Sequence, residues 1–186
     1  DTVDYYGNLP LYYCLKQDDH AMLVKHFTKG RDYFLLRNYK YETVFHICAK
    51  ANALESLKIL CGRATFITQL FKKDYEGCTA IHVAARSGSR DVLEWLLKLA
   101  TPGFLEIRND FGFTPLEAAQ AKVALMRETL DAKSDMSPED KIELREKMAK
   151  IQDCVNFLLK FDEFLSEDSW NAQFDQKLDT FLEQIA

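Results

Sequence analysis

The stretch CTAIHVAARSG, residues 78–88, places one histidine between a threonine and a pair of alanines. Thr79 suits the position before a helix, because its hydroxyl can accept a hydrogen bond from an exposed backbone N–H of the first turn. Gly88 suits the end of that helix, because glycine adopts the left-handed conformation without steric cost. His82 would then lie in the first turn, either in a reactive site or as a residue that holds the fold together.

The same pattern recurs along the chain at nearly constant spacing. ETVFHICAKAN, residues 42–52, repeats it 36 residues earlier, and FTPLEAAQA, residues 113–121, repeats it 35 residues later. NLPLYYCLKQD, residues 8–18, is a weaker copy, 34 residues before the copy at 42–52. The threonine and histidine positions of the four copies hold Leu9 and Tyr12, Thr43 and His46, Thr79 and His82, and Thr114 and Glu117. Four copies in one register indicate an internal repeat.

The copy that begins at Asp74 resembles the ankyrin-repeat family. It carries Asp74, Gly77, Thr79-Ala80-Ile81-His82, Ala84-Ala85, Gly88, Val92 and Leu96-Leu97. The resemblance covers residues 4–120 and a displaced piece near residue 154. It implies an all-α solenoid of about four helix-turn-helix repeats, at about 4–37, 38–73, 74–108 and 109–160. Each repeat is too small to fold alone and buries its apolar face only by stacking on its neighbours.

The resemblance also implies a role for the histidines. In this family the histidine of the repeated element typically hydrogen-bonds locally and to the backbone of an adjacent repeat. We therefore expect structural roles for five residues, namely His46, His82, Thr43, Thr79 and Thr114. Cys48 lies two residues from His46, but side chains two residues apart on a helix diverge by about 200°. The pair is not a catalytic dyad.

One turn departs from the family pattern. Asp4, Asn38, Asp74 and Asn109 head the finger-like turns, where Asx side chains favour a turn. Tyr41 stands where the other turns have Gly7, Gly77 and Gly112. Because a tyrosine at positive φ costs about 1 kcal/mol or more, we expect this turn to be reshaped.

The fourth repeat contains a long insertion. Its second-helix signature, CVNFLL at residues 154–159, comes 62 residues after its counterpart VLEWLL at 92–97, against 35 residues for the first helix. Apolar residues at helical spacing run from Leu116 to Leu130 and again from Leu144 to Leu158. We expect an inserted helical hairpin at about 123–150. Residues 166–186, with Trp170 and Phe174 on one face, predict an amphipathic helix that caps the solenoid or docks on a partner.

Composition excludes several kinds of ligand. Apolar residues make up 47% of the chain, charged residues make up 28%, and the formal net charge is −5. Residues 1–115 carry 15 basic and 13 acidic side chains, whereas residues 116–186 carry 9 and 16. An acidic balance gives no basis for nucleic-acid binding. No apolar run is long enough to predict membrane insertion.

Neither the cysteines nor the sequence motifs indicate a metal site or a catalytic site. The five cysteines are an odd number without a CxxC pair, which disfavours both a closed disulfide set and a zinc site. We expect a reducing compartment, the cytosol or the nucleus. GxGxxG, GxxxxGK[ST], HExxH and GxSxG are all absent from the sequence. We therefore expect no catalytic residue, no metal and no cofactor.

Two rows of side chains are candidates for binding a protein partner. Aromatic residues cluster on the finger turns: Tyr5, Tyr39, Tyr41, Tyr75, Phe111 and Phe113. Tyrosine is enriched among interface anchors, although these rings could instead pack between adjacent fingers. Lys16, Lys50 and Arg86 form a basic row near the ends of the first helices. They could accept an acidic or extended segment, or simply complement the helix dipoles.

The sequence therefore predicts a non-catalytic module that binds a protein through its aromatic fingers and concave inner-helix groove. We expect it to be monomeric or part of a larger chain. The alternative is the regulatory ankyrin portion of a larger enzyme, channel or secreted effector, which docks in cis. The start at Asp1, close to the first finger, favours a missing upstream part.

Overall fold

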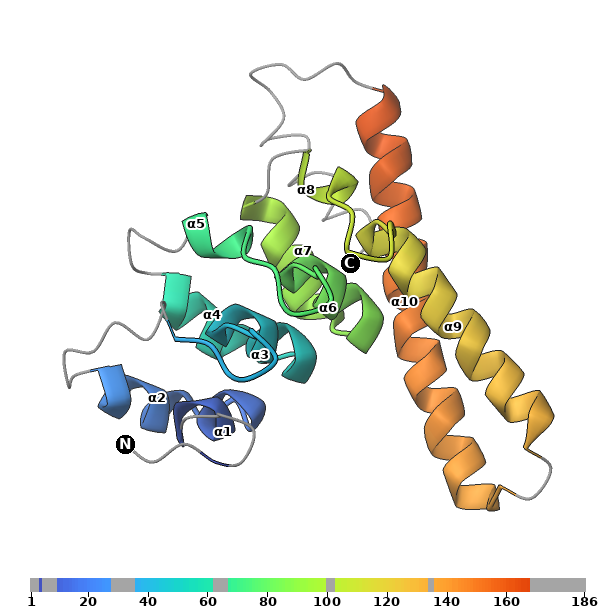
Figure 1. Ribbon diagram of the computed structural model, residues 1–186, viewed down its shortest axis with the longest axis horizontal. Coiled ribbons are helices and arrows are strands. Elements are labelled where there is room, and N and C mark those ends of the chain that lie inside the picture. The colour runs from blue at the N-terminus through green and yellow to red at the C-terminus, as the bar shows by residue number, and fades with distance from the viewer. Residues whose placement is uncertain are drawn as a thin grey trace.

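The computed structural model describes residues 4, 10–27, 36–61, 67–99, 103–133 and 136–167, and within these ranges every regular element is a helix (Figure 1). The helices are α1 (Pro10–Lys16), α2 (His20–Phe27), α3 (Val44–Ala51), α4 (Leu54–Cys61), α5 (Ile67–Leu70), α6 (Ala80–Ser87), α7 (Arg90–Leu99), α8 (Gly103–Glu106), α9 (Pro115–Ala132) and α10 (Pro138–Glu167). None of the helices described is both long enough and apolar enough to cross a membrane.

The helices stack in two rows, as expected for a solenoid. The first helices of the repeats contact one another in the order α1, α3, α6 and α9, and the second helices in the order α2, α4, α7 and α10. Small side chains line the first row, where Ala49, Ala84, Ala85 and Ala119 are fully buried. Leucines fill the space between the rows, among them Leu57, Leu93 and Leu96. The predicted all-α ankyrin solenoid is confirmed.

The finger turns that the structure describes share one hydrogen-bond pattern. Each begins with an Asx residue whose Oδ1 accepts the backbone N–H groups two and four residues later. The three Asx residues are Asn38, Asp74 and Asn109. Adjacent fingers are joined through their backbones, because the N–H of Tyr75 donates to the carbonyl of Lys40 at 3.0 Å. The expected role of the Asx residues is confirmed in these turns, whereas most of the finger at Asp4 lies outside the described residues.

The expectation that the turn at Tyr41 is reshaped is wrong. Tyr41 has a φ of 57° and so adopts the left-handed conformation of Gly77 (72°) and Gly112 (81°). Its N–H donates to the carbonyl of Asn38 at 2.9 Å, as in the other turns. The hydrogen bonds of Asn38 and of the neighbouring finger fix the backbone, and the tyrosine ring extends into solvent. The turn therefore keeps its usual shape, with Tyr41 in the strained left-handed conformation.

We expect the Tyr41→Gly variant to be more stable than the parent by about 0.5–1 kcal/mol. Glycine removes the cost of positive φ, which is larger than the entropy that glycine gains in the unfolded chain. Urea unfolding measures the difference. Tyr39→Gly is the control, since Tyr39 has no positive φ and its replacement should lower stability. Equal destabilisation in both variants would contradict the left-handed assignment.

The turns between the paired helices also recur, with one change. Asp18 and Asn52 have positive φ values of 50° and 55°, and each side chain accepts a backbone N–H from the second helix of the next repeat. Asp18 accepts the N–H of Ser56 at 2.9 Å, and Asn52 accepts that of Val92 at 3.2 Å. The third turn has Gly88, with a φ of 73°, in the same register. Here α10 passes directly over the glycine, and an added Cβ would lie 2.7 Å from Cβ of Lys150 and 2.9 Å from its carbonyl carbon.

Parts of the segments between repeats form extra helical turns. α5 and α8 lie in these segments, and their neighbouring rings Phe71 and Phe104 pack with centroids 4.0 Å apart. Phe104 is buried, whereas Phe71 is half exposed. The extra turns therefore lengthen the contact between successive repeats.

The last two helices form a hairpin that extends past the solenoid (Figure 1). α9 has 18 residues and α10 has 30, against 8 for α3 and α6. Val123 and Met126 of α9 and Ile151 and Val155 of α10 are buried. The expected capping or docking helix at 166–186 lies outside the described residues, except for the end of α10.

Candidate partner-binding surface

In the first three repeats the residue at the histidine position is tied to the next repeat by a hydrogen bond. His46 Nε2 lies 2.9 Å from the carbonyl oxygen of Cys78, and His82 Nε2 lies 3.1 Å from that of Phe113. In the first repeat the Tyr12 hydroxyl donates to the carbonyl of Glu42 at 3.2 Å. All three acceptors occupy one position, the residue before the helix-starting threonine.

The other histidine nitrogen closes the start of its own helix. Because a carbonyl can only accept, Nε2 must carry the hydrogen, and Nδ1 is then the acceptor. Nδ1 of His82 accepts the N–H of Thr79 at 3.3 Å and lies 2.9 Å from the Thr79 hydroxyl. Nδ1 of His46 has the same two partners in Thr43, at 3.2 and 2.9 Å.

Burial keeps both histidines neutral. Both side chains are fully buried. Desolvation lowers the pKa of His82 to about 4, outweighing its hydrogen bond to the carbonyl of Phe113, and it also lowers the pKa of His46. All of these contacts are made inside the stack. Three cavities of the described part of the chain are lined by neither histidine.

In the last repeat a carboxylate replaces the histidine. Glu117 Oε2 accepts the N–H of Thr114 at 2.8 Å, and the Thr114 hydroxyl accepts the N–H of Glu117 at 3.3 Å. Arg108 Nη1 donates to the same carboxylate at 2.9 Å. Glu117 therefore closes its helix, but as an acceptor it cannot reach onward to a carbonyl of a further repeat.

The aromatic side chains of the finger turns are exposed. Tyr39 is 70% exposed, Phe111 66%, Tyr41 58%, Tyr75 55% and Phe113 42%. Tyr5 lies outside the described residues. These exposures are high for large rings and leave little room for packing between adjacent fingers. The rings line the tips of three successive fingers.

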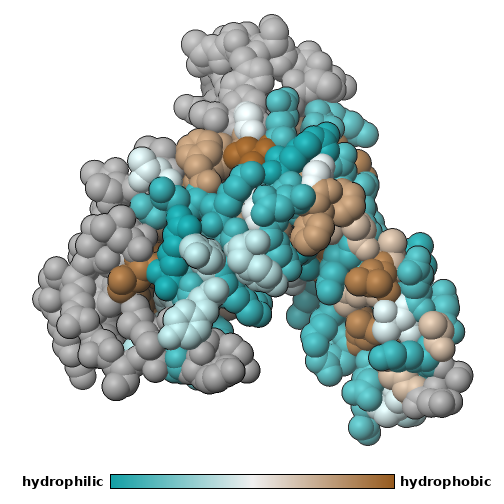
Figure 2. Space-filling view, viewed as in Figure 1, coloured by the Kyte–Doolittle hydropathy of each residue, from teal (hydrophilic) through white to brown (hydrophobic). Residues whose placement is uncertain are grey.

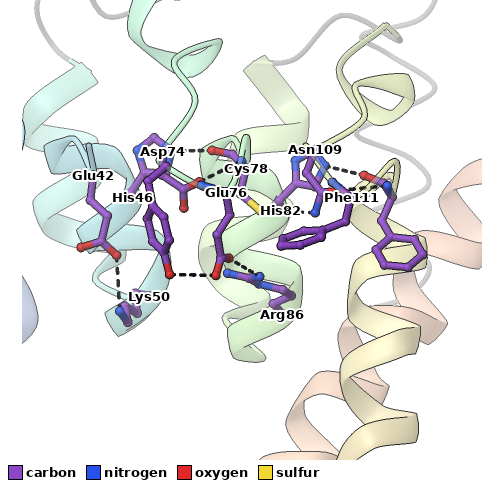
Figure 3. A network of polar contacts seen from close by, with 12 residues as sticks. Glu42, His46, Lys50, Asp74, Glu76, Cys78, His82, Arg86, Asn109 and Phe111 are labelled. Carbon is purple, nitrogen blue, oxygen red and sulfur yellow. Dashed lines mark hydrogen bonds and ion pairs between the residues drawn. The ribbon is translucent and has the colours of Figure 1, made fainter. Parts of the chain in front are cut away.

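The basic row is partly neutralised by the same fingers (Figure 3). Lys50 Nζ lies 3.3 Å from Glu42 Oε1, and Arg86 Nη1 lies 2.7 Å from Glu76 Oε2. Lys16 instead lies 5.2 Å from the centroid of the Tyr13 ring. The structure thus uses two of the three cations to tie an inner helix to its own finger.

A polar chain runs from a finger ring to the inner helix. The Tyr75 hydroxyl donates to Glu76 Oε1 at 2.9 Å, and Glu76 accepts from Arg86 through its other oxygen. Burial alone would raise the pKa of Glu76, but the hydrogen bonds from Arg86 and Tyr75 lower it overall. The hydrogen bond to Glu76 in turn raises the pKa of Tyr75. The hydrogen bond of its hydroxyl therefore orients the Tyr75 ring, while the side chain remains 55% exposed.

One finger brings three metal-ligand types together. Ligand atoms of Asp74, Glu76 and Cys78 lie within 4.8 Å of one another. Asp74 already accepts two backbone N–H groups, Glu76 is paired with Arg86, and burial raises the pKa of the Cys78 thiol. These contacts build the turn and give each of the three groups a structural role without a metal ion.

Sequence reasoning missed the bond from Tyr12 to Glu42 and the roles of Asp18 and Asn52. The register itself carried the signal. Tyr12 aligns with His46 and His82, and Asp18 and Asn52 align with Gly88. Reading each aligned position for its hydrogen-bonding capacity, instead of its likeness to the family, would have found all three.

The repeated geometry defines the class of protein. A family model for ankyrin repeats, in three copies, matches residues 11–103 and 45–126. The chain therefore belongs to the ankyrin-repeat family, whose repeats form protein–protein interaction modules.

A curated relative can be named as well. Start control protein cdc10 of Schizosaccharomyces pombe (strain 972 / ATCC 24843) is 28% identical over 107 residues. The match covers 51% of this chain and 14% of that protein. The similarity thus concerns a small part of the relative's length.

Proposed function

We propose that this chain is a non-catalytic module that binds a segment of a protein partner across its aromatic finger turns and concave inner helices. The observation that carries the proposal is the exposure of five aromatic rings along three successive fingers. Exposed tyrosine and phenylalanine cost solubility, whereas rigid aromatic rings are favoured anchors in interfaces. Lys16, Lys50 and Arg86 border this surface, and they would supply the electrostatic part of the recognition.

The strain at Tyr41 supports the same proposal. A residue at positive φ persists where the surrounding structure fixes it, and such residues cluster at functional sites. Tyr41 is 58% exposed, so its ring contributes little to the solenoid core. Contact with a partner would account for a tyrosine where glycine is less strained.

Partner capture from lysate tests the proposal. We expect the chain to retain a protein that the triple variant Tyr39→Ala, Tyr75→Ala and Phe111→Ala loses by at least tenfold, since anchor residues are worth about 2 kcal/mol or more each. Circular dichroism checks that the variant keeps its helices. Leu125→Ala with Ile142→Ala is the matched control, because both residues are exposed apolar positions on the hairpin (56% and 55% exposed). Equal capture by the triple variant and the parent would refute the proposed surface.

The alternative is a regulatory ankyrin portion that docks in cis within a larger protein. The match covers 14% of the yeast relative, so the similar part of that protein belongs to a much longer chain. Adding the isolated chain to the full-length protein distinguishes the two cases. If the finger surface docks in cis, the isolated parent should compete for the docking site within the full-length protein, whereas the isolated triple variant should not. We further propose that residues 123–150 are an insertion within a fourth repeat.

We also propose that the chain acts in the cytosol or nucleus, where thiols stay reduced. All five cysteines are free thiols, and burial raises the pKa of Cys61 and Cys154 to about 12.

A further inference from the structure

The projecting hairpin creates a groove at the end of the inner helices opposite to the finger turns. One side consists of the C-terminal ends of α3 and α6 and the turns that follow them, and the other side is α10. Figure 2 shows the hollow between the solenoid and the hairpin. Its volume is about 600 Å³, and it is lined by Lys50, Ala51, Asn52, Ser87, Gly88, Ser89, Arg90, Lys147, Ala149, Lys150 and Asp153.

The floor of the groove is made of small side chains. Ala51, Ser87, Gly88, Ser89 and Ala149 present at most a methyl or hydroxymethyl group to it. α10 covers Gly88, and Ser89 is buried, but Ser87 and Ala149 are exposed and Ala51 is half-buried. The asparagine at the edge is already engaged, because Asn52 Nδ2 donates to Asp91 at 2.8 Å. The open part of the floor therefore leaves room for the main chain of a peptide.

The walls of the groove carry positive charge in an acidic protein. Four cations line it, Lys50, Arg90, Lys147 and Lys150, against one carboxylate, Asp153, whereas the whole chain has a net charge of −5. Arg90 and Asp153 offset each other, with Nη1 and Oδ2 3.5 Å apart, and the guanidinium lies 3.6 Å from the centroid of the Phe157 ring. Lys50 is paired with Glu42 and Lys147 with Glu143, so Lys150 is the lining cation that makes no ion pair with the residues that the structure describes.

The lysines are open to solvent. The side chains of Lys50 and Lys147 are 54% and 61% exposed, and their partners Glu42 and Glu143 belong to their own repeat and helix. Lys150 is exposed and makes no ion pair with the residues that the structure describes. Exposed pairs of this kind contribute little to stability, so the cations are free to change partner.

We propose that this groove binds an acidic, extended peptide segment of a protein partner. Charge complementarity selects the segment, and the small side chains of the floor leave room for its main chain. A nucleic-acid duplex is disfavoured, because its charges are far denser than those of an acidic peptide and the acidic side chains of α9 and α10 repel it more strongly. The groove contains none of the aromatic finger residues, although Lys50 belongs to both surfaces, and the inference rests on the proposed function only in that the partner is a protein.

Fluorescence anisotropy with a labelled peptide of alternating Glu and Gly tests the proposal. We expect saturable binding that weakens as salt is raised, and at least tenfold weaker binding of the matched Gln and Gly peptide. The double variant Lys147→Ala and Lys150→Ala should lose about tenfold in affinity. The matched control, Lys122→Ala with Arg145→Ala, removes the same charge from exposed positions that do not line the groove and should stay within twofold.

Each other outcome overturns the proposal. Equal losses in the two double variants would show an effect of net charge alone. Absence of saturable binding to the Glu peptide would show that the groove has no such ligand, and tighter binding of single-stranded DNA would assign the groove to a different polyanion. The triple variant of the aromatic fingers should bind the Glu peptide as the parent does. That comparison separates failure of the groove from failure of the finger surface.

Discussion

Gly88→Ala is expected to lower the free energy of unfolding by about 3 kcal/mol and to loosen the α9–α10 hairpin. Part of the cost is the positive φ of 73°, which is worth about 1 kcal/mol or more for a residue with a Cβ. The rest is overpacking, because the new methyl group would lie 2.9 Å from the carbonyl carbon of Lys150 and 3.0 Å from the backbone nitrogen of Ile151. The backbone of a helix cannot move aside as a flexible side chain would.

Gly112→Ala is the matched control for this variant. Gly112 has a φ of 81°, but an added Cβ would meet nothing within 4 Å. Its replacement should therefore cost only the conformational term, about 1 kcal/mol. Urea unfolding measures both variants, and hydrogen exchange of α9 and α10 reports the detachment of the hairpin. Equal costs for the two variants would mean that α10 does not rest on Gly88.

The same contact links stability to the proposed groove. Gly88 lies in the floor of the groove, and Lys150 lies in its wall. A variant that pushes α10 away from Gly88 should therefore weaken binding of the Glu peptide, although it removes no charge. Gly112→Ala should leave that binding unchanged, since Gly112 is not among the groove residues.

The parts of the fold that could be predicted from the sequence are those set within one repeat. The helix starts at Thr43, Thr79 and Thr114 follow from local capping chemistry, and the Asx residues of the finger turns follow from local hydrogen bonds. The register of the copies then placed the core, because identical positions are buried in each repeat. Such features depend on residues a few positions apart.

The parts that could not be predicted depend on residues far apart in the chain. The groove joins Lys50, Gly88 and Lys150, and nothing local to any of them indicates the other two. The expectation for Tyr41 failed for a related reason. Its local preference is against positive φ, but hydrogen bonds within the turn and to the next finger outweigh a cost of about 1 kcal/mol.

The second large effect concerns His82 and pH. We expect His82→Ala to lower the free energy of unfolding at pH 7 by about 3 kcal/mol, because it opens a cavity and leaves the N–H of Thr79 and the carbonyl of Phe113 without their buried partner. We also expect the stability of the parent to fall as the pH is lowered from 7 to 5. In the unfolded chain the histidine has its ordinary pKa of 6.5 and takes up a proton in this range, whereas the folded chain, with a His82 pKa of about 4, does not.

The size of the pH effect follows from the same two values. Between pH 7 and 5 His82 contributes a loss of about 2 kcal/mol, and His46, whose pKa is also lowered by burial, adds to that loss. The loss would level off only below about pH 4. Chemical unfolding at pH 7, 6 and 5 measures it, in a range above the ordinary pKa values of the carboxylates.

Tyr12→Phe separates the hydrogen bond from the titration. Tyr12 makes the equivalent bond between repeats, to the carbonyl of Glu42, and burial raises the pKa of its hydroxyl, so the group stays neutral throughout this range. Its removal should lower the free energy of unfolding by about 1 kcal/mol at every pH and leave the dependence of that free energy on pH unchanged. His82→Ala should instead remove the part of the pH dependence of the free energy of unfolding that comes from His82. If His82→Ala keeps the full slope of the parent, protonation of His82 is not coupled to unfolding, and His82 is not held neutral in the folded chain.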